Sequence, residues 1–246
     1  SGSRNIGKQV AEIYQQMAID DISGKSNFKQ DSEKLIAEYK KCKREREISK
    51  AIKELKQSYK TNTTKIPREL SYLVGKHREM YLHDMKLCQE FAKINRRIIQ
   101  STICYYMCWE VTKETERFQT IHNYIEYDTN IVRKGAISAK TGEKVLIPIN
   151  MRDGCILGIG KGNEDWNYSA PHGAGRTMSR SKAKESILLE EYQKAMDGIF
   201  TTSVNTSTID ESPMAYKTMD EIIGNIKDTV EIVDIIKPIY NFKANE

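Results

Sequence analysis

The 246-residue sequence lacks several features that would assign it to a particular class of protein. No stretch approaches the roughly 20 consecutive apolar residues that a membrane-spanning helix requires, so we expect no membrane among its partners. The first residues do not show the basic and then apolar pattern of a secretory signal peptide. We therefore expect a cytoplasmic protein. The sequence also contains no internal repeat and no low-complexity tract.

Cysteine is scarce, and the odd number of five does not match the spacing of a disulfide framework. Reduced thiols are therefore expected. Cys104 and Cys108 lie four residues apart in a predicted helix that also carries His77 and His83. A zinc site is one interpretation of this group, but buried reduced thiols are favoured.

The net charge of +5 mildly favours a polyanionic partner, although many soluble proteins have a similar balance. The basic segment from Lys40 to Arg46 is a candidate for contact with RNA phosphate. Because Glu38, Glu45 and Glu47 interrupt it, a solvated helix face is the favoured interpretation.

Before about residue 120 the pattern is helical. One apolar face over residues 6–17 predicts a first helix, and a loop is expected at residues 23–27. Ile48, Ile52, Leu55 and Tyr59 predict a second helix, and residues 61–67 form a polar break. A long helix is predicted from about Arg68 to about Val111. Its buried side is expected to carry Met80, Leu87, Phe91, Ile94 and Ile98.

After residue 120 the pattern favours strands and glycine-rich loops. Residues 131–136, 144–149 and 155–159 are β-prone, and the end of the chain alternates as strands from Val230 to Lys243. A helix is predicted from Ser181 to Met196, and a capping box at Thr218–Glu221 opens a shorter one. The segment Gly158–Asn163 does not fit a dinucleotide-binding fingerprint, so we interpret it mostly as a turn.

The most informative segment begins at His172, which is followed by Gly173, Ala174 and Gly175. Glycine backbones approach phosphate closely, and successive N–H groups together with a helix N-terminus attract anions. Nearby cations (Arg176, Arg180, Lys182 and Lys184) add positive charge. A histidine beside such a site can attack phosphorus. The alternative is a surface loop whose histidine is merely polar.

A second candidate is the His122–Tyr124 segment, which lies just before the strands. A histidine at such a boundary can bind metal through one ring nitrogen. The alternative, which spacing alone favours, is a structural histidine held by hydrogen bonds.

Taken together and in order, these segments resemble the RtcB-type RNA-splicing ligases over the whole chain. Any one motif is weak, but so many in one order are specific. The start of the chain resembles the family's His-Ser-Gly-Ser-Arg-x-x-Gly motif without its first histidine. The segments that carry the resemblance are Ser1–Gly7, Gln89–Arg96, His122–Tyr124, Arg133–Ala136, Gly162–Asn163, His172–Arg176, Met178–Arg180, Pro213–Lys217 and Lys243.

The resemblance implies an α+β, RtcB-like fold, in which a mainly helical part (residues 1–120) packs on a strand-rich, nucleotide-binding part (residues 121–246). These would form the C-terminal portion of one catalytic domain. It also implies His172 as the histidine that accepts GMP, His122 as a metal ligand, and RNA phosphate bound by Arg4, Arg176 and Arg180. The implied nucleotide contacts are His122, Asn123, Pro148, Ile149, Asn150, Met151, Cys155, His172, Gly173, Ala174, Gly175, Tyr216 and Lys243.

The implied reaction joins an RNA 3′-phosphate or 2′,3′-cyclic phosphate end to a 5′-hydroxyl end, with GTP and Mn²⁺, in tRNA splicing or RNA repair. The family's N-terminal metal-binding half is expected to be absent here, and a separate chain is one possible source of it. Two departures stand out: the family's Pro-Gly-Ser-Met-Gly loop here reads Pro148 to Arg152, and Cys155 replaces a usual serine. The alternatives are an inactive nucleotide- or RNA-binding remnant and a helical scaffold.

Overall fold

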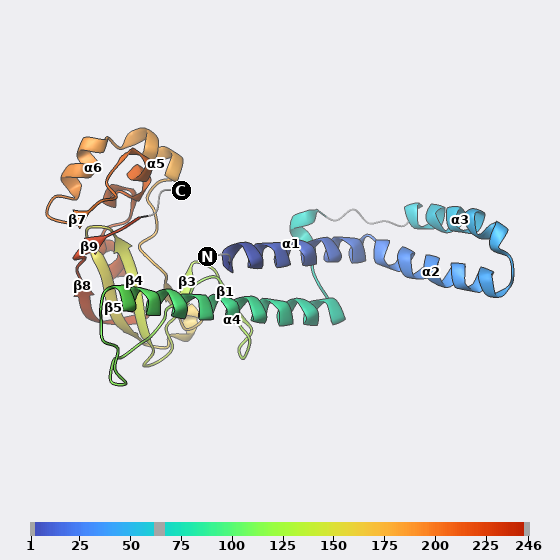
Figure 1. Cartoon of the computed structure of the whole chain (residues 1–246), viewed down its shortest axis with the longest axis horizontal. Coiled ribbons are helices and arrows are strands. Elements are labelled where there is room, and N and C mark those ends of the chain that lie inside the picture. Colours follow the sequence, from blue (N-terminus) through green and yellow to red (C-terminus); the bar gives the residue numbers. More distant parts are fainter. Residues whose placement is uncertain (1–2, 62–66, 244–246) are drawn as a thin grey trace. The chain divides into compact units, whose positions relative to one another are not determined.

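The computed structural model describes residues 3–61 and 67–243 and contains both helices and strands, as the predicted α+β class requires (Figure 1). The chain divides into two compact units, Ser1–Val111 and Thr112–Glu246. This division lies close to the compositional change near residue 120. Within the described residues, no helix is long and apolar enough to cross a membrane.

The first unit is helical. Its elements are α1 (Ser3–Ile22), α2 (Lys25–Lys41), η1 (Glu45–Glu47), α3 (Ile48–Thr61), η2 (Arg68–Leu70) and α4 (Gly75–Tyr106). The loop expected at residues 23–27 is much shorter, because Gly24 adopts a left-handed conformation (φ +73°) and α2 begins at the next residue. The basic run ends α2 and forms the following turn, which is exposed, with Arg44 paired to Glu47 at 2.5 Å. The break predicted at residues 61–67 falls mainly outside the described residues.

Aromatic and polar contacts connect the helices in pairs. On the α1–α4 pair, Tyr14 donates a hydrogen bond to Asp84 (2.7 Å) and stacks edge-on against Tyr81. On the α2–α3 pair, Tyr59 donates to Asp31 (2.5 Å). These contacts hold the helices of each pair together, but few large apolar side chains are buried between the helices.

The long helix α4 differs from its prediction in two ways. It begins at Gly75 rather than near Arg68, which lies in the separate turn η2. None of its residues, all of which the structure describes, is buried. The side expected to be buried is exposed to solvent, for example 58% for Leu87 and 60% for Ile98. The helical period was predicted correctly, but the burial was wrong.

The second unit is built around a three-stranded antiparallel sheet in the order β4–β5–β8 (Figure 1). Burial alternates along β5, as expected for a sheet with one face against a core. Three two-stranded pairs (β1–β2, β3–β6 and β7–β9) complete the strands. The strand bounds are β1 (Tyr124–Glu126), β2 (Ile131–Arg133), β3 (Ala136–Ser138), β4 (Lys144–Asn150), β5 (Gly154–Gly160), β6 (Ser169–Pro171), β7 (Phe200–Thr201), β8 (Val230–Ile236) and β9 (Tyr240–Asn241).

The helices of this unit are short. Their bounds are η3 (Glu164–Trp166), α5 (Arg180–Ser186), α6 (Leu189–Ala195), η4 (Thr206–Glu211), η5 (Pro213–Ala215) and α7 (Met219–Asn225). The single helix predicted over residues 181–196 is therefore wrong. The Glu191 carboxylate accepts a hydrogen bond from the Leu188 amide and so starts a new helix there. The predicted helix start at Thr218 is confirmed, since the Thr218 hydroxyl accepts from the Glu221 amide at 3.3 Å, while the Glu221 carboxylate accepts from Lys217.

Two predictions for segments that contain glycine also differ from the structure. The run predicted at residues 131–136 is divided between β2 and β3, with Gly135 (φ +68°) between them. Gly158 and Gly160 lie in β5 rather than in a turn. A Cβ on Gly160 would lie 2.4 Å from the backbone of Ala139, so this glycine permits a close approach of two chain segments.

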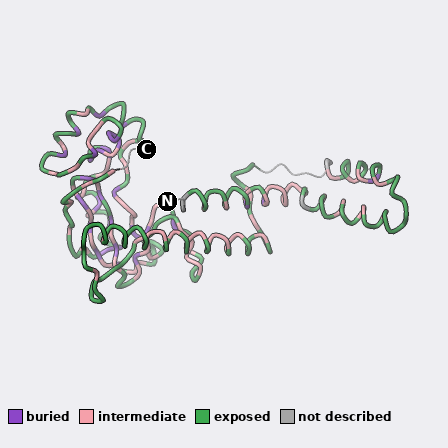
Figure 2. Tube along the Cα trace, viewed as in Figure 1, coloured by how far each residue is buried: buried purple, intermediate pink, exposed green. Residues whose placement is uncertain are grey.

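Two apolar clusters form the interior of this unit, and they account for most of the buried segments in Figure 2. The first cluster lies on the sheet and includes Val145, Ile147 and Ile156, all fully buried. The second lies around Tyr192 and includes Met151 and Ala215. The β4–β5 hairpin ends between them, and this end carries one wall of the pocket described next.

Candidate nucleotide site

A pocket of about 670 Å³ opens in the strand-rich unit. It is lined by the β4–β5 turn, by the segment that begins at His172, by Glu211 and Tyr216, and by residues between positions 236 and 243. Every residue expected to contact the nucleotide lines this pocket, except His122 and Asn123. The structure therefore brings together residues from positions 148 to 243 that were grouped from the sequence by resemblance.

His172 lies at the end of β6 and is half-buried. Its Nδ1 atom lies 2.6 Å from the carbonyl oxygen of Gly135, and its ring centroid lies 4.6 Å from that of His122. Asn123 approaches the same loop, because its side-chain oxygen accepts a hydrogen bond from the Gly135 amide at 2.8 Å. His172 is thus held by main chain and by a second ring, unlike a free polar histidine on a loop.

The glycines after His172 do not form a complete anion nest. The Ala174 amide donates to the carbonyl of Pro148 (3.1 Å), so it is not available to a phosphate. The next helix begins only at Arg180, where the Ser179 side chain caps the amide of Lys182. The helix start expected near Ser181 is therefore confirmed to within one residue, and the glycines themselves line the pocket.

The β4–β5 turn forms another wall. Asn150 accepts hydrogen bonds through its side chain from the amides of Arg152 and Asp153, which fixes the turn without the family's glycines. Ile149 and Met151 also line the pocket, and both are almost fully buried. Burial raises the pKa of the Cys155 thiol, which is therefore neutral near pH 7.

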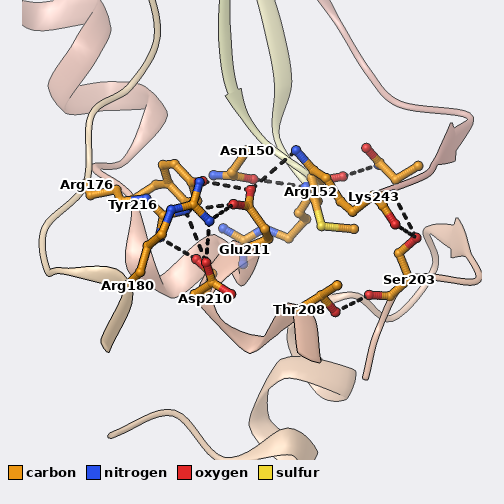
Figure 3. Close-up of polar contacts among 12 residues, drawn as sticks. Asn150, Arg152, Arg176, Arg180, Ser203, Thr208, Asp210, Glu211, Tyr216 and Lys243 are labelled. Atoms are coloured by element: carbon orange, nitrogen blue, oxygen red, sulfur yellow. Dashed lines mark hydrogen bonds and ion pairs between the residues drawn. The ribbon is translucent and has the colours of Figure 1, made fainter. Parts of the chain in front are cut away.

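Glu211 is a pocket residue that the sequence did not single out. It follows Asp210 at the end of η4, and its carboxylate accepts from the Tyr216 hydroxyl (2.9 Å) and from Arg176 (2.8 Å) (Figure 3). Lys243 lies 3.4 Å from the same carboxylate. Burial opposes the ionisation of Glu211, but the Tyr216 hydrogen bond and the nearby cations outweigh it and lower its pKa.

Tyr216 is fixed from several directions. Arg176 donates to its hydroxyl (2.7 Å), and the guanidinium carbon lies 4.6 Å from the ring centroid, within the range of a cation–π contact. Burial, followed by the hydrogen bond to Glu211, raises the pKa of Tyr216 to about 12. The ring is therefore neutral and rigidly placed at the pocket wall.

Asp210 extends this network away from the pocket. It is 3% exposed and pairs with Arg180, while Lys184 lies 3.6 Å from it. Burial would raise the pKa of Asp210, but the Arg180 hydrogen bond and the Lys184 charge lower it instead. Four cations thus surround two carboxylates, which leaves a positive excess beside the pocket; the cations are Arg176, Arg180, Lys184 and Lys243.

The three arginines predicted to bind RNA phosphate differ in their location and exposure. Arg4 belongs to α1, in the other unit, and its side chain lies outside the described residues. The guanidinium of Arg176 is largely engaged by protein acceptors, whereas the Arg180 side chain is 55% exposed. No sequence pattern pointed to Asp210 or Glu211, because their partners, Arg176 and Arg180, lie about 30 residues away in the chain.

Metal-ligating residues are sparse. Among the residues that the structure describes, no three or more His, Cys, Asp or Glu side chains are grouped so as to hold a metal ion. His122 offers one exposed imidazole, so the described part of the chain does not fit a complete Mn²⁺ site. In the helical unit, His77 lies 2.5 Å from Asp21, and Cys108 is exposed rather than buried as expected.

Comparison with known proteins identifies the family of this chain. Residues 1–244 match the model of the family described as tRNA-splicing ligase RtcB. The RNA-splicing ligase RtcB of Escherichia coli (strain K12) is 29% identical over 213 residues, which covers 80% of this chain. The tRNA-splicing ligase RtcB of Aeropyrum pernix is 41% identical over 86 residues (33% of this chain and 18% of that protein).

A third relative, the tRNA-splicing ligase RtcB of Nanoarchaeum equitans, is 28% identical over 192 residues (63% of this chain and 40% of that protein). The match spans 51% of the Escherichia coli protein, so this chain spans about half the length of that relative. Since the family match extends over nearly the whole sequence, the chain belongs to the tRNA-splicing ligase RtcB family.

Proposed function

We propose that this chain is the nucleotide-carrying portion of an RNA ligase, that it accepts GMP from GTP on His172, and that it passes GMP to RNA. One observation carries the proposal: His172 lines the same pocket as Glu211, Tyr216 and Lys243. A nucleophile, an aromatic ring and paired charges around one cavity suit a purine nucleotide better than they suit a structural cavity.

The proposed reaction has three steps, and in each step one bond to phosphorus forms and another breaks. An unprotonated ring nitrogen of His172 attacks the α-phosphorus of GTP, forms a P–N bond and releases pyrophosphate. An oxygen of an RNA 3′-phosphate attacks the same phosphorus, and the P–N bond breaks. A 5′-hydroxyl then attacks the RNA phosphate and displaces GMP. Where the RNA ends in a 2′,3′-cyclic phosphate, addition of water opens it first.

The pocket residues divide by chemistry. Tyr216 presents a ring for the base, while Lys243 and Glu211 supply a donor and an acceptor beside it. Residues Pro148 to Met151 and Gly173 to Gly175 line another part of the cavity, with Cys155 as a neutral thiol. RNA phosphate is assigned to Arg180, with Arg176 and Arg4 as further candidates, because the network near Arg180 has excess positive charge.

We also propose GTP and Mn²⁺ as cofactors, with His122 as one metal ligand. The further ligands would come from the part of the family's length that this chain does not match, whether in the same polypeptide or in a separate chain. In this proposal the two units act as one portion of a catalytic domain, with a role in tRNA splicing or RNA repair and a cytoplasmic location, which cell fractionation would check.

The test is transfer of label from GTP labelled at the α-phosphate, with Mn²⁺, to the chain alone and to the chain mixed with the remaining half of a relative. We expect acid-labile label on the protein that His172→Ala abolishes. His83→Ala, on an exposed histidine of α4, is the matched control and should label normally. Label that survives His172→Ala would contradict the proposal.

A second candidate function is nucleotide or RNA binding without covalent transfer. It is favoured by the incomplete metal site among the described residues. It predicts saturable GMP binding to the pocket but no covalent label, even when the two halves are shown to associate. Joining of RNA ends by the reconstituted pair would exclude it.

A further inference from the structure

Two hydrogen bonds in series connect Asn123 to His172 through one residue. The side-chain oxygen of Asn123 accepts from the Gly135 amide (2.8 Å), and the Gly135 carbonyl lies 2.6 Å from Nδ1 of His172. Both polar groups of the Gly135 backbone are therefore used. Asn123 itself does not line the pocket, so its described contact leads to the histidine rather than into the cavity.

The second hydrogen bond determines which ring nitrogen carries the proton. A carbonyl oxygen can only accept, so Nδ1 must be the donor in this contact. A neutral imidazole has one N–H group, and its other nitrogen then carries the free lone pair. The contact with Gly135 therefore leaves Nε2 of His172 as the nucleophilic atom.

The local backbone explains why these two residue types occur here. Gly135 has φ +68° and Asn123 has φ +59°, both in the left-handed region that glycine and asparagine tolerate best. A Cβ on Gly135 would lie 3.6 Å from the His172 ring, an ordinary contact, so backbone strain rather than a clash would oppose a side chain there. The His122 ring, 4.6 Å away and tilted by 45°, packs beside the same imidazole.

We propose that Asn123 is a positioning residue, which orients Gly135 so that its carbonyl holds His172 with Nε2 unprotonated. The contact between Asn123 and the nucleotide that the resemblance implies is a separate prediction, which this role does not replace. The positioning role rests on the proposed function only in naming His172 as the nucleophile, because the proton position is a property of the chain itself.

The first test is NMR of the ¹⁵N-labelled full chain, above the ordinary titration range of histidine. Long-range ¹H–¹⁵N spectra distinguish the two nitrogens, and the sequence has four histidines, so His172→Gln identifies the signals. We expect a protonated Nδ1 and an unprotonated Nε2 in His172. Asn123→Ala should give a mixture of tautomers, whereas Asn123→Asp, which keeps an acceptor oxygen, should preserve the wild-type pattern.

Asn130→Ala is the matched control. Asn130 is also an asparagine in the left-handed region (φ +58°) but is exposed in the turn between β1 and β2, so its spectrum should match the wild type. A wild-type His172 protonated on Nε2 would overturn the proposal. An unchanged His172 pattern in Asn123→Ala would do the same.

The labelling assay supplies the second readout. Asn123→Ala should lower the maximal rate of label transfer by about 10- to 100-fold, as for other residues that orient a functional histidine, with little change in the GTP concentration at half-saturation. If the tautomer is as proposed and no variant is ever labelled, the proposed function fails and the positioning role stands. If wild type and Asn123→Ala label at equal rates, the positioning role fails and the function stands.

Discussion

Ile156 on β5 is fully buried, whereas Ile98 on α4 is 60% exposed, although each belongs to an apolar pattern that predicts burial. The same contrast holds between the units, because most of the buried apolar residues belong to the strand-rich one (Figure 2). Apolar periodicity thus shows which residues share a face, but it does not show what covers that face.

The contrast has an energetic consequence. Burial of apolar surface contributes roughly 25 cal/mol per Å², and the strand-rich unit gains it from the two clusters around Ile147 and Tyr192. The helical unit relies more on helix propensity and on contacts such as Tyr14 with Asp84. The pocket therefore lies in the unit with the larger core, which suits residues that must be held in a fixed geometry.

The largest expected difference is in apolar truncation. Ile156→Ala should lower the free energy of unfolding of the strand-rich unit by about 2–5 kcal/mol, because it leaves a cavity in a packed core. Ile98→Ala should change stability by no more than about 0.5 kcal/mol, as is usual for exposed positions. Urea denaturation followed by circular dichroism would measure both. Equal losses of unfolding free energy in the two variants would contradict the difference in burial between Ile156 and Ile98.

Glycine replacement should act in opposite directions in the two units. Gly160→Ala should destabilise by about 1–3 kcal/mol, because the new methyl group overlaps the Ala139 backbone. Gly7 lies in α1, and a Cβ added there would have no heavy atom within 4 Å, so Gly7→Ala should stabilise by up to about 1 kcal/mol. Thermal melts of both variants would check the signs, and a stabilising Gly160→Ala would contradict the close packing.

The pocket network should give an intermediate effect. Glu211→Gln keeps the shape but removes the charge that faces Arg176 and Lys243, and it should cost about 1.5 kcal/mol of stability through weakened charged hydrogen bonds. Glu190→Gln, at an exposed position of α6, is the control and should be neutral. A change of similar size in both variants would mean that Glu211 has no special role.

The last expected effect appears only in acid. Burial opposes the ionisation of Glu126, but hydrogen bonds from Lys140, Thr129 and Arg133 outweigh it and lower its pKa from 4.5 to about 2. Because the folded-state pKa is lowered, this group stabilises the fold above pH 4.5, and the contribution is lost as the pH falls toward 2. Glu126→Gln should flatten that part of the stability profile. A profile with the wild-type slope would contradict the assignment.

Much of the strand-rich unit followed from the sequence. The strands at β4 and β5 and the Thr218 cap were predicted, because strand propensity and capping are local signals. The set of pocket residues was instead grouped by the resemblance to the family. The break between α5 and α6 was missed, since it depends on one Glu191 contact. Glu211 was also missed, because its importance comes from groups far apart in the chain, Arg176 and Lys243, that meet only after folding.

In the helical unit, the positions of helices were predicted from the sequence, but their burial was not. The positions of α1, α3 and most of α4 were predicted from the 3.6-residue period. The exposure of α4 was not, because periodicity carries no information about the partner layer. A loop was predicted at residues 23–27, but the structure has one left-handed residue, Gly24, and α2 begins after it. Composition did not predict this, since the lysine and serine that follow Gly24 are compatible with a loop or a helix.

The most direct test of the account is hydrogen exchange of the whole chain with and without GTP, in the presence and absence of Mn²⁺. We predict slowed exchange in peptides from residues 148–155, 172–176 and 211–216, which line the pocket, and no change in α4. His172→Ala should keep most of this protection, because it removes the nucleophile and leaves the rest of the cavity. Protection confined to the helical unit, or no protection at the pocket at saturating GTP, would contradict the placement of the nucleotide in the strand-rich unit.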